Sequence, residues 1–182
     1  MLLKFVEKVK LGDFKMTEKD FMQYWKIYNQ AFPDEERRGE EAQKKLLKNE
    51  KYDISLYYKN DKVIGFMALW KLKKFTFLEH FAVNEKFRGK GLGRKILKDI
   101  KMKYGDSLIL EVELPYNSIA VRRINFYKRA GFHYNNYPYF QPPYQEGRKP
   151  VELRIMSYPT AVSKEKFEVI KQMLYNQVYN IK

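Results

Sequence analysis

Apolar residues recur along the chain with two different periods, and these periods locate its expected helices and strands. Residues 2–9 alternate between apolar and polar positions, which predicts a first strand. Thr17 and Asp20, three residues apart, can form a capping box at the start of a helix. The apolar residues that follow this cap at helical spacing are Phe21, Tyr24, Trp25 and Tyr28. The helix should end at Phe32, because Pro33 disfavours helical backbone in the residue before it.

A charged second helix is expected over residues 38–49, before the period changes to that of strands. Three of its apolar residues should face inward: Ala42, Leu46 and Leu47. The next three strands are expected at residues 53–60, 62–72 and 75–83. Asn60 and Asp61 form a hairpin-like turn between the first two of these strands.

The second half of the chain alternates helices with strands. Helices are expected at residues 91–105 and 118–131, and strands at 107–114, 132–135 and 151–158. Gly105 and Gly131 should stop the two helices. A loop rich in proline and tyrosine, residues 137–150, should separate the last two strands. A final helix should begin near Ser163, because apolar residues then recur on one side of it. The inward residues of the first and last helices of this half are Leu92, Ile96, Leu97, Ile100, Phe167, Ile170, Leu174 and Val178.

This order of elements predicts an α/β fold with a mixed sheet, because meander strands come first and two strand–helix units follow. We expect a single domain over residues 1–182, with a core over about 1–158 and an additional C-terminal helix over about 163–180. A chain of 182 residues can bury roughly 70% of its unfolded surface in one such domain.

Composition narrows the possible chemistry. The chain has no cysteine, which excludes disulfides, thiolate metal sites and a cysteine-bound acyl intermediate. This composition fits a reducing cytosol, so we expect a cytoplasmic protein, and we expect no metal. No apolar run approaches the ~20 residues needed to cross a bilayer, and the first residues lack the apolar core of a signal peptide. We therefore expect no membrane partner.

The formal net charge of +14 has two interpretations. It can reflect a lysine-rich, solvated surface, or it can indicate an anionic ligand such as a phosphorylated cofactor, nucleic acid or an acidic membrane surface. The charge is densest over residues 84–104, where eight lysines and arginines stand against two acids, a local net charge of +6.

Three glycines fall inside this basic stretch, at positions 89, 91 and 93, between an expected strand and an expected helix. A helix start presents unpaired N–H groups and the positive end of the helix dipole, and glycine lets a phosphate approach the main chain. The spacing lacks the GxxxxGK[ST] of a Walker loop, and Arg94 stands where a Rossmann fingerprint needs its third glycine. The alternatives that remain are a phosphate-binding loop and an ordinary turn.

Two stretches, LEHFAVNEKFRGKGLGRKIL and LEVELPYNSIAVRRINFYKRAGF, closely resemble the signatures of the GNAT superfamily of N-acetyltransferases. Residues 88–93 match the (Arg/Gln)-x-x-Gly-x-(Gly/Ala) loop that holds the pyrophosphate of acetyl-CoA in that family. The second signature is matched by Asn117, Phe126, Tyr127, Ala130, Gly131 and Phe132. The resemblance covers about residues 1–158 and departs at Glu85, where many members have proline. It implies a mostly antiparallel sheet that is splayed between its fourth and fifth strands.

The resemblance also implies which residues contact the acetyl-CoA co-substrate. Main-chain groups around Phe81 and Val83 would pair with the pantetheine arm and meet the thioester oxygen. The residues implied in cofactor binding are Phe81, Ala82, Val83, Arg88, Gly89, Lys90, Gly91, Leu92, Gly93, Arg94, Asn117 and Tyr127. Asn117 can in addition cap the following helix. Arg122 and Arg123 could reach a phosphate, and we expect one of them to be solvated.

Two residues are implied in catalysis. Tyr127 matches the family's general acid, whose hydroxyl faces the departing sulfur. Glu79 lies where many relatives place the carboxylate that takes the amine's proton, and burial beside aromatic residues should raise its pKa. Strand alternation places Glu79, Phe81 and Val83 on one face unless a bulge intervenes.

His80 should then face the opposite side of the sheet, and it is the alternative proton acceptor. We expect His133 to be structural. Without a cysteine or a Gly-x-Ser-x-Gly elbow, the reaction is expected to be direct attack in a ternary complex.

The acceptor should enter between residues 31–41 and 137–147. The first segment offers Asp34, Glu35, Glu36, Glu40 and Glu41, and the second offers Tyr137, Tyr139, Phe140 and Tyr144. Acids beside aromatics suit a cationic amine, so a small amine or a peptide amino group is the expected acceptor.

Two other functions stay open at this point. The domain could bind acyl-CoA without catalysis, as a sensor or scaffold. A basic nucleic-acid-binding module is the weaker alternative, because the charge is concentrated at a helix start rather than along an aromatic sheet face. The C-terminal helix could contribute a homodimer interface or a lid.

Overall fold

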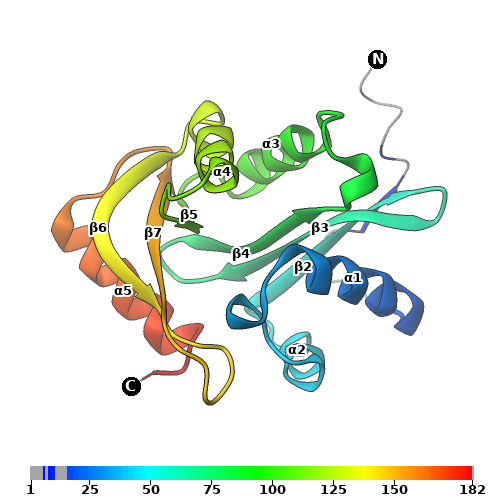
Figure 1. Cartoon of the computed structure of the whole chain (residues 1–182), viewed down its shortest axis with the longest axis horizontal. Coiled ribbons are helices and arrows are strands. Elements are labelled where there is room, and N and C mark those ends of the chain that lie inside the picture. Colours follow the sequence, from blue (N-terminus) through cyan, green and yellow to red (C-terminus); the bar gives the residue numbers. More distant parts are fainter. Residues whose placement is uncertain (1–5, 7, 11–15, 182) are drawn as a thin grey trace.

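The computed structural model describes residues 6, 8–10 and 16–181 and follows the expected order of elements (Figure 1). The strands are β1 (Lys8–Lys10), β2 (Tyr52–Lys59), β3 (Lys62–Lys71), β4 (Thr76–Val83), β5 (Leu108–Glu113), β6 (His133–Gln141) and β7 (Val151–Tyr158). The α-helices are α1 (Glu18–Ala31), α2 (Glu40–Leu46), α3 (Leu92–Tyr104), α4 (Ser118–Arg129) and α5 (Lys164–Gln177). Two short 3-10 helices are η2 (Asp34–Glu36) and η3 (Glu85–Phe87).

The strands form one seven-stranded sheet in the order β1-β2-β3-β4-β5-β7-β6. All neighbours pair antiparallel except β4 and β5, which run parallel. That parallel ladder is short: it joins Thr76–Leu78 to Leu108–Leu110 and then stops. The expected fold class, a mixed and mostly antiparallel sheet that is splayed between its fourth and fifth strands, is confirmed.

Helices cover both faces of the sheet (Figure 1). Helices α1 and α5 bury Phe21, Tyr24, Phe167 and Leu174 in one apolar cluster. On the other face, α3 and α4 bury Ile96, Leu97, Ile124 and Tyr127 in a second cluster. The sheet therefore separates two cores, and a gap between its strands connects them.

Local sequence signals account for several of these elements. The side chain of Thr17 accepts from the N–H of Asp20, and the capping box at the start of α1 is confirmed. Asn60 and Asp61 have φ angles of 47° and 55°, which suit the tight turn between β2 and β3. The inward residues expected for α3 are all buried.

The bounds of the first strand and of α2, and one residue expected to face inward, differ from the structure. The strand expected at residues 2–9 falls largely on residues outside the described part, and β1 is described over Lys8–Lys10. Helix α2 is shorter than 38–49, and its buried residue is Gln43, which donates to the Tyr52 hydroxyl at 3.0 Å. Leu46 and Leu47 pack against the core, as expected. Ala42 is exposed, so its expected inward position is wrong.

The strand expected at 132–135 continues to Gln141, so residues 137–141 are not part of a loop. The pairing of β6 with β7 is irregular between Asn135 and Tyr139. Pairing resumes at Tyr139, whose side chain is buried in the core. The proline in this segment therefore falls at a bulge, where its missing N–H leaves the ladder intact. No helix among the described residues is long and apolar enough to span a bilayer.

Candidate functional site

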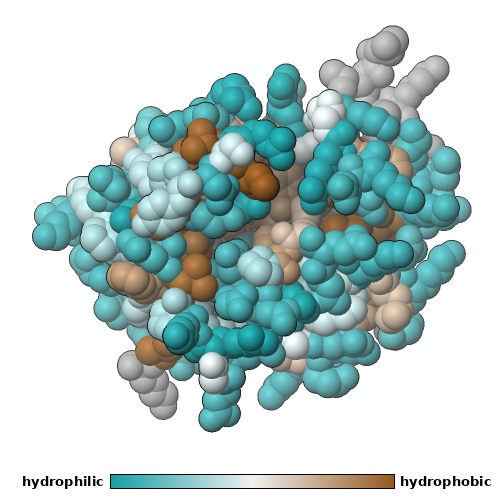
Figure 2. Space-filling model, in the orientation of Figure 1, coloured by the Kyte–Doolittle hydropathy of each residue, from teal (hydrophilic) through white to brown (hydrophobic). Residues whose placement is uncertain are grey.

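A cavity of about 560 Å³ opens where β4 and β5 part. Side chains from both strands, α4, the end of α1 and the segment after β6 line it. Figure 2 shows apolar side chains set back between hydrophilic ones near the middle of this face. A second hollow of about 320 Å³ lies against the glycine-rich turn and shares Val83, Arg88 and Gly89 with the first. The turn and the gap between the strands thus border one connected groove.

A bulge in β4 decides which side chains face this cavity. Ala68 of β3 pairs with His80 and Leu69 pairs with Leu78, which leaves Glu79 as the extra residue. The His80 ring lies edge-on to Tyr28 and Phe32, on the α1 side of the sheet. Glu79 bonds groups on that same side, whereas Phe81 packs near Phe126 of α4 on the opposite side. The bulge that the expectation allowed for does intervene, so Glu79 lies on the same side as His80 and not on that of Phe81.

Glu79 is held by cationic and hydroxyl groups. Its buried carboxylate accepts from Nη2 of Arg38 at 2.8 Å and from the Tyr144 hydroxyl at 3.2 Å, and Nδ1 of His80 lies 3.3 Å away. Burial alone would raise the pKa of Glu79, but Arg38 and His80 together lower it well below its usual range. The expected rise in pKa is wrong, and Glu79 stays an ionised partner of a buried guanidinium.

Glu111 of β5 lies in an environment that shifts its pKa in the opposite direction to that of Glu79. The Tyr139 hydroxyl donates to it, and the Tyr179 hydroxyl donates to both of its oxygens at 3.0 and 2.9 Å. Burial nevertheless raises the pKa of Glu111 to about 8, because the two hydrogen bonds only partly offset desolvation. Glu111 lines the cavity and can exchange a proton near neutral pH.

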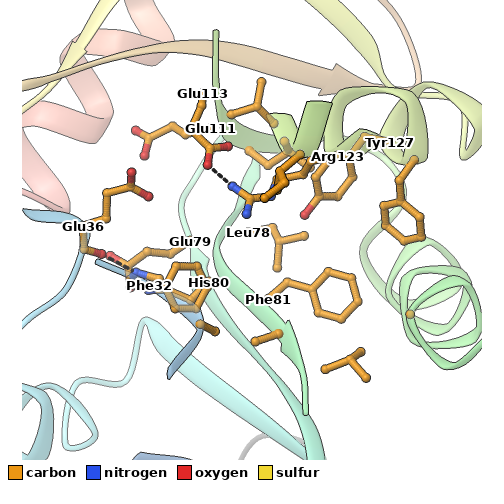
Figure 3. A pocket seen from close by; sticks show the side chains of 18 of the residues that line it. Phe32, Glu36, Leu78, Glu79, His80, Phe81, Glu111, Glu113, Arg123 and Tyr127 are labelled. Atoms are coloured by element: carbon orange, nitrogen blue, oxygen red, sulfur yellow. Dashed lines mark hydrogen bonds and ion pairs between the residues drawn. The ribbon is translucent and has the colours of Figure 1, made fainter. Parts of the chain in front are cut away.

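Two further carboxylates line the same end of the cavity (Figure 3). Glu113 forms an ion pair with Arg123 of α4. Burial, with Glu113 nearby, raises the pKa of Glu36. The main-chain oxygen of Glu36 lies 2.9 Å from Nε2 of His80, which ties η2 to β4. Arg123 offsets Glu113, so Glu36 and Glu111 are the carboxylates at this acidic end that form no ion pair within the described part of the chain, and in their ionised forms they suit a cation.

Tyr127 lies on α4 and lines the cavity from the side opposite η2 (Figure 3). It packs edge-on against Phe126 and Phe132. Burial raises the pKa of Tyr127 to about 12, so its hydroxyl keeps its proton at neutral pH and can donate it. Helix α4 is held at its start by Asn117, whose side-chain oxygen accepts from the N–H groups of Ile119 and Ala120.

The glycine-rich turn has the backbone that its sequence predicts. Gly89 and Gly91 have φ angles of 75° and 78°, in the left-handed region that favours glycine. Gly91 is the N-cap of α3, so the first N–H groups of that helix point out of its end and lack intrahelical acceptors. Arg88 folds back and donates from Nε to the main-chain oxygen of Val83 at 3.0 Å. This turn presents amides and positive charge to the groove, as an anion site requires.

The structure brings most of the predicted site residues to this groove. Those that line one of its two hollows are Glu79, Phe81, Ala82, Val83, Arg88, Gly89, Gly91, Leu92, Gly93, Arg94 and Tyr127, and Arg122 and Arg123 lie with them. Lys90 and Asn117 line neither hollow. His133 lies elsewhere, with Nε2 2.9 Å from the main-chain oxygen of Pro159.

Some of the residues predicted to contact the acceptor amine line the cavity, and others do not. Glu36 and Tyr144 line the cavity. Asp34 and Glu35 instead lie within ion-pair distance of Arg148. Within the described part of the chain, no cluster of three His, Asp or Glu side chains is arranged to hold a metal ion.

Sequence reasoning missed Glu111, and a signal for it was present. The segment LILEVEL places Glu111 between apolar residues in the middle of a strand whose other acid, Glu113, stands at its end. Alternation assigns position 111 to a buried or half-buried face. Such an acid needs buried partners, and both tyrosines that supply them come from distant segments.

Comparison with known proteins supplies the family. Residues 19–132 match the acetyltransferase (GNAT) family. YjbC of Bacillus subtilis (strain 168), whose name assigns it to the acetyltransferases, is 30% identical over 114 residues. That alignment covers 61% of this chain and 57% of YjbC, so the chain spans little more than half of this relative's length.

Solved structures extend the similarity to nearly the whole chain. A GNAT-family protein from Bacteroides thetaiotaomicron is 30% identical, with a TM-score of 0.85 over 96% of this chain and 99% of that one. A GNAT acetyltransferase from Elizabethkingia anophelis, solved with acetyl-CoA bound, shares the fold with a TM-score of 0.57. It is 18% identical, and the alignment covers 82% of this chain and 95% of that one. Because the family match covers more than half of the residues and both signature stretches, the chain belongs to the GNAT family of acetyltransferases.

Proposed function

We propose that this protein is an N-acetyltransferase that moves the acetyl group of acetyl-CoA to an amine by direct attack in a ternary complex. The observation that carries the proposal is the pairing of two groups in one cavity. Glu111 can accept a proton near pH 8, and Tyr127 keeps one to donate. Acetyl transfer to an ammonium group needs both.

The groove offers a place for each part of acetyl-CoA. The N–H groups around residues 88–93 would hold the diphosphate, and Arg88, Lys90 and Arg94 add positive charge. The β4 main chain at residues 81–83, where the ladder with β5 has ended, would pair with the pantetheine arm. The fold shared with a relative solved with acetyl-CoA supports this placement.

The acceptor amine would enter at the acidic end of the cavity. Glu111 would take a proton from the ammonium, and the free amine would attack the thioester carbon. A C–N bond forms as the C–S bond breaks, and Tyr127 would give its proton to the departing thiolate. The nitrogen would lose its second proton to solvent and Tyr127 would regain one from solvent, so that the amide, the free thiol and one proton are released in total. Glu79, the base expected from the resemblance, stays a prediction; its lowered pKa and its ion pair with Arg38 favour Glu111.

Glu36 and the aromatic ring of Tyr144 suit a cationic acceptor, either a small amine or a peptide amino group. A screen of polyamines, aminoglycosides, amino acids and peptides with acetyl-CoA tests the proposal by thiol release and by the mass of the product. We expect at least one amine to gain an acetyl group faster than acetyl-CoA hydrolyses. If acetyl-CoA binds tightly and no amine in the panel is acetylated, the non-catalytic acyl-CoA-binding function would replace this proposal.

A further inference from the structure

The residues that follow α5, 178–181, bring Tyr179 into contact with Glu111 and Tyr144, two residues that line the cavity. Helix α5 is anchored through Phe167, Ile170 and Leu174, which are buried in the core. At its end, the N–H groups of Val178 and Tyr179 both donate to the main-chain oxygen of Leu174, at 2.9 and 3.1 Å. Asn180 has a φ of 56°, the left-handed conformation that ends many helices. Tyr179 is thus fixed by the helix end and is not on a loose tail.

Tyr179 connects the carboxylates of the two diverging strands. Its hydroxyl donates to Glu111 of β5, and its oxygen lies 3.3 Å from the hydroxyl of Tyr144. Tyr144 in turn donates to Glu79 of β4, which also accepts from Arg38. A chain of hydroxyl groups therefore runs from one carboxylate to the other across the gap in the sheet.

This chain accommodates both protonation states of Glu111. When Glu111 is ionised, Tyr179 donates to Glu111 and Tyr144 donates to Glu79. When Glu111 is protonated, it can donate to Tyr179, which then donates to Tyr144, and Tyr144 still donates to Glu79. Every hydroxyl proton has an acceptor in each state, and the ionised Glu79 is the fixed end of the chain.

We propose that Tyr179 is a positioning residue for Glu111, so that the segment after α5 forms part of the active site. This inference rests on the proposed function, in which Glu111 accepts the proton of the amine. It adds to that function a tyrosine from outside the stretch that resembles the family signatures. The other groups that shift the pKa of Glu111 are Tyr139 of β6, Glu79 of β4 and Glu36 of η2. The phenols of Tyr144, in the segment after β6, and Tyr175 of α5 also face Glu111, and neither forms a hydrogen bond to it.

The test is the titration of Glu111 in Tyr179→Phe, followed by carbon NMR of labelled glutamate carboxyl groups and assigned with Glu111→Gln. A hydrogen bond to the ionised form lowers a carboxyl pKa, so its loss should move the midpoint about one pH unit higher. The rise of kcat/KM with pH should move by the same amount. The rate at pH 7 should therefore fall about tenfold and recover as the pH is raised.

Tyr175→Phe is the matched control, because it removes a tyrosine hydroxyl one turn earlier, near the end of α5, that donates to the main-chain oxygen of Phe140 and not to Glu111. Its titration midpoint should stay near the native value. An unchanged midpoint in Tyr179→Phe would overturn the inference, and so would a rate loss that is equal at every pH. If the native protein acetylates no amine, the proposed function fails, while the NMR midpoint still decides whether Tyr179 governs Glu111.

Discussion

Two glutamates on neighbouring strands show how environment assigns opposite chemistry to the same side chain. Glu79 faces a buried guanidinium, which lowers its pKa and keeps it ionised. Glu111 faces two tyrosine hydroxyls and no cation within ion-pair distance among the described residues, and burial raises its pKa to about 8. Carboxylates whose pKa values are pushed apart in one site divide structural and proton-transfer roles between them.

Glu111→Gln should reduce kcat/KM by about 100-fold or more, because the amide cannot accept the amine's proton. The dissociation constant for CoA should change little, since the proposed diphosphate site is at the other end of the groove. In the native protein the same kcat/KM should rise with pH through about pH 8, as Glu111 loses its proton. Steady-state thiol release across pH measures the loss of kcat/KM in the variant and the pH dependence of kcat/KM in the native protein. A flat pH profile in the native protein would contradict the role of Glu111 as proton acceptor.

Glu79→Gln should instead act on stability. It leaves the guanidinium of Arg38 buried without its anion, which typically costs about 3–5 kcal/mol of unfolding free energy. Urea unfolding of the variant beside the native protein measures this loss. If Glu79→Gln unfolds like the native protein but has lost its activity, Glu79 and not Glu111 is the proton acceptor.

At the scale of elements, periodicity predicted most of what the structure contains. Thr17, the Asn60–Asp61 turn and the apolar face of α3 each carry a local signal, because caps, turns and helix faces depend on near neighbours. No local signal predicted the side of the sheet on which Glu79 lies, since the bulge that decides it arises from pairing with β3. Glu111 depends on contacts 28 and 68 residues away, which no local pattern records.

The function proposed for the glycine-rich turn depends on its backbone, and this dependence can be tested apart from stability. In Gly89→Ala the new Cβ would meet no atom within 4 Å, but the native turn would require alanine to adopt a φ of 75°. The left-handed backbone costs about 1–2 kcal/mol for alanine. We expect the turn to relax and the affinity for CoA, measured by calorimetry, to fall about tenfold.

Gly147→Ala supplies the control for that measurement. Gly147 also has open space around it and a φ of 79°, and it lines neither hollow of the groove. Its substitution should cost similar stability and leave CoA affinity unchanged. Equal CoA affinities in both variants would argue against a role of the turn in holding the nucleotide.

At the scale of the whole molecule, the early end of the β4–β5 ladder is what gives the fold its site. The gap connects a basic turn at the start of α3 with an acidic end beneath η2. In a chain of net charge +14, this separation would direct the proposed anionic donor and cationic acceptor to opposite ends of one groove. The sequence predicted the basic end through its glycines and predicted two residues at the other end, Glu36 and Tyr144, whereas Glu111 and Glu113 required the folded structure.

The most direct test of this account is a crystal structure of the protein with CoA bound. We predict the diphosphate against the amides of residues 88–93, the pantetheine arm between β4 and β5, and the sulfur within hydrogen-bond distance of the Tyr127 hydroxyl. CoA bound elsewhere, or a turn at residues 88–93 that stays empty at saturating CoA, would contradict the account.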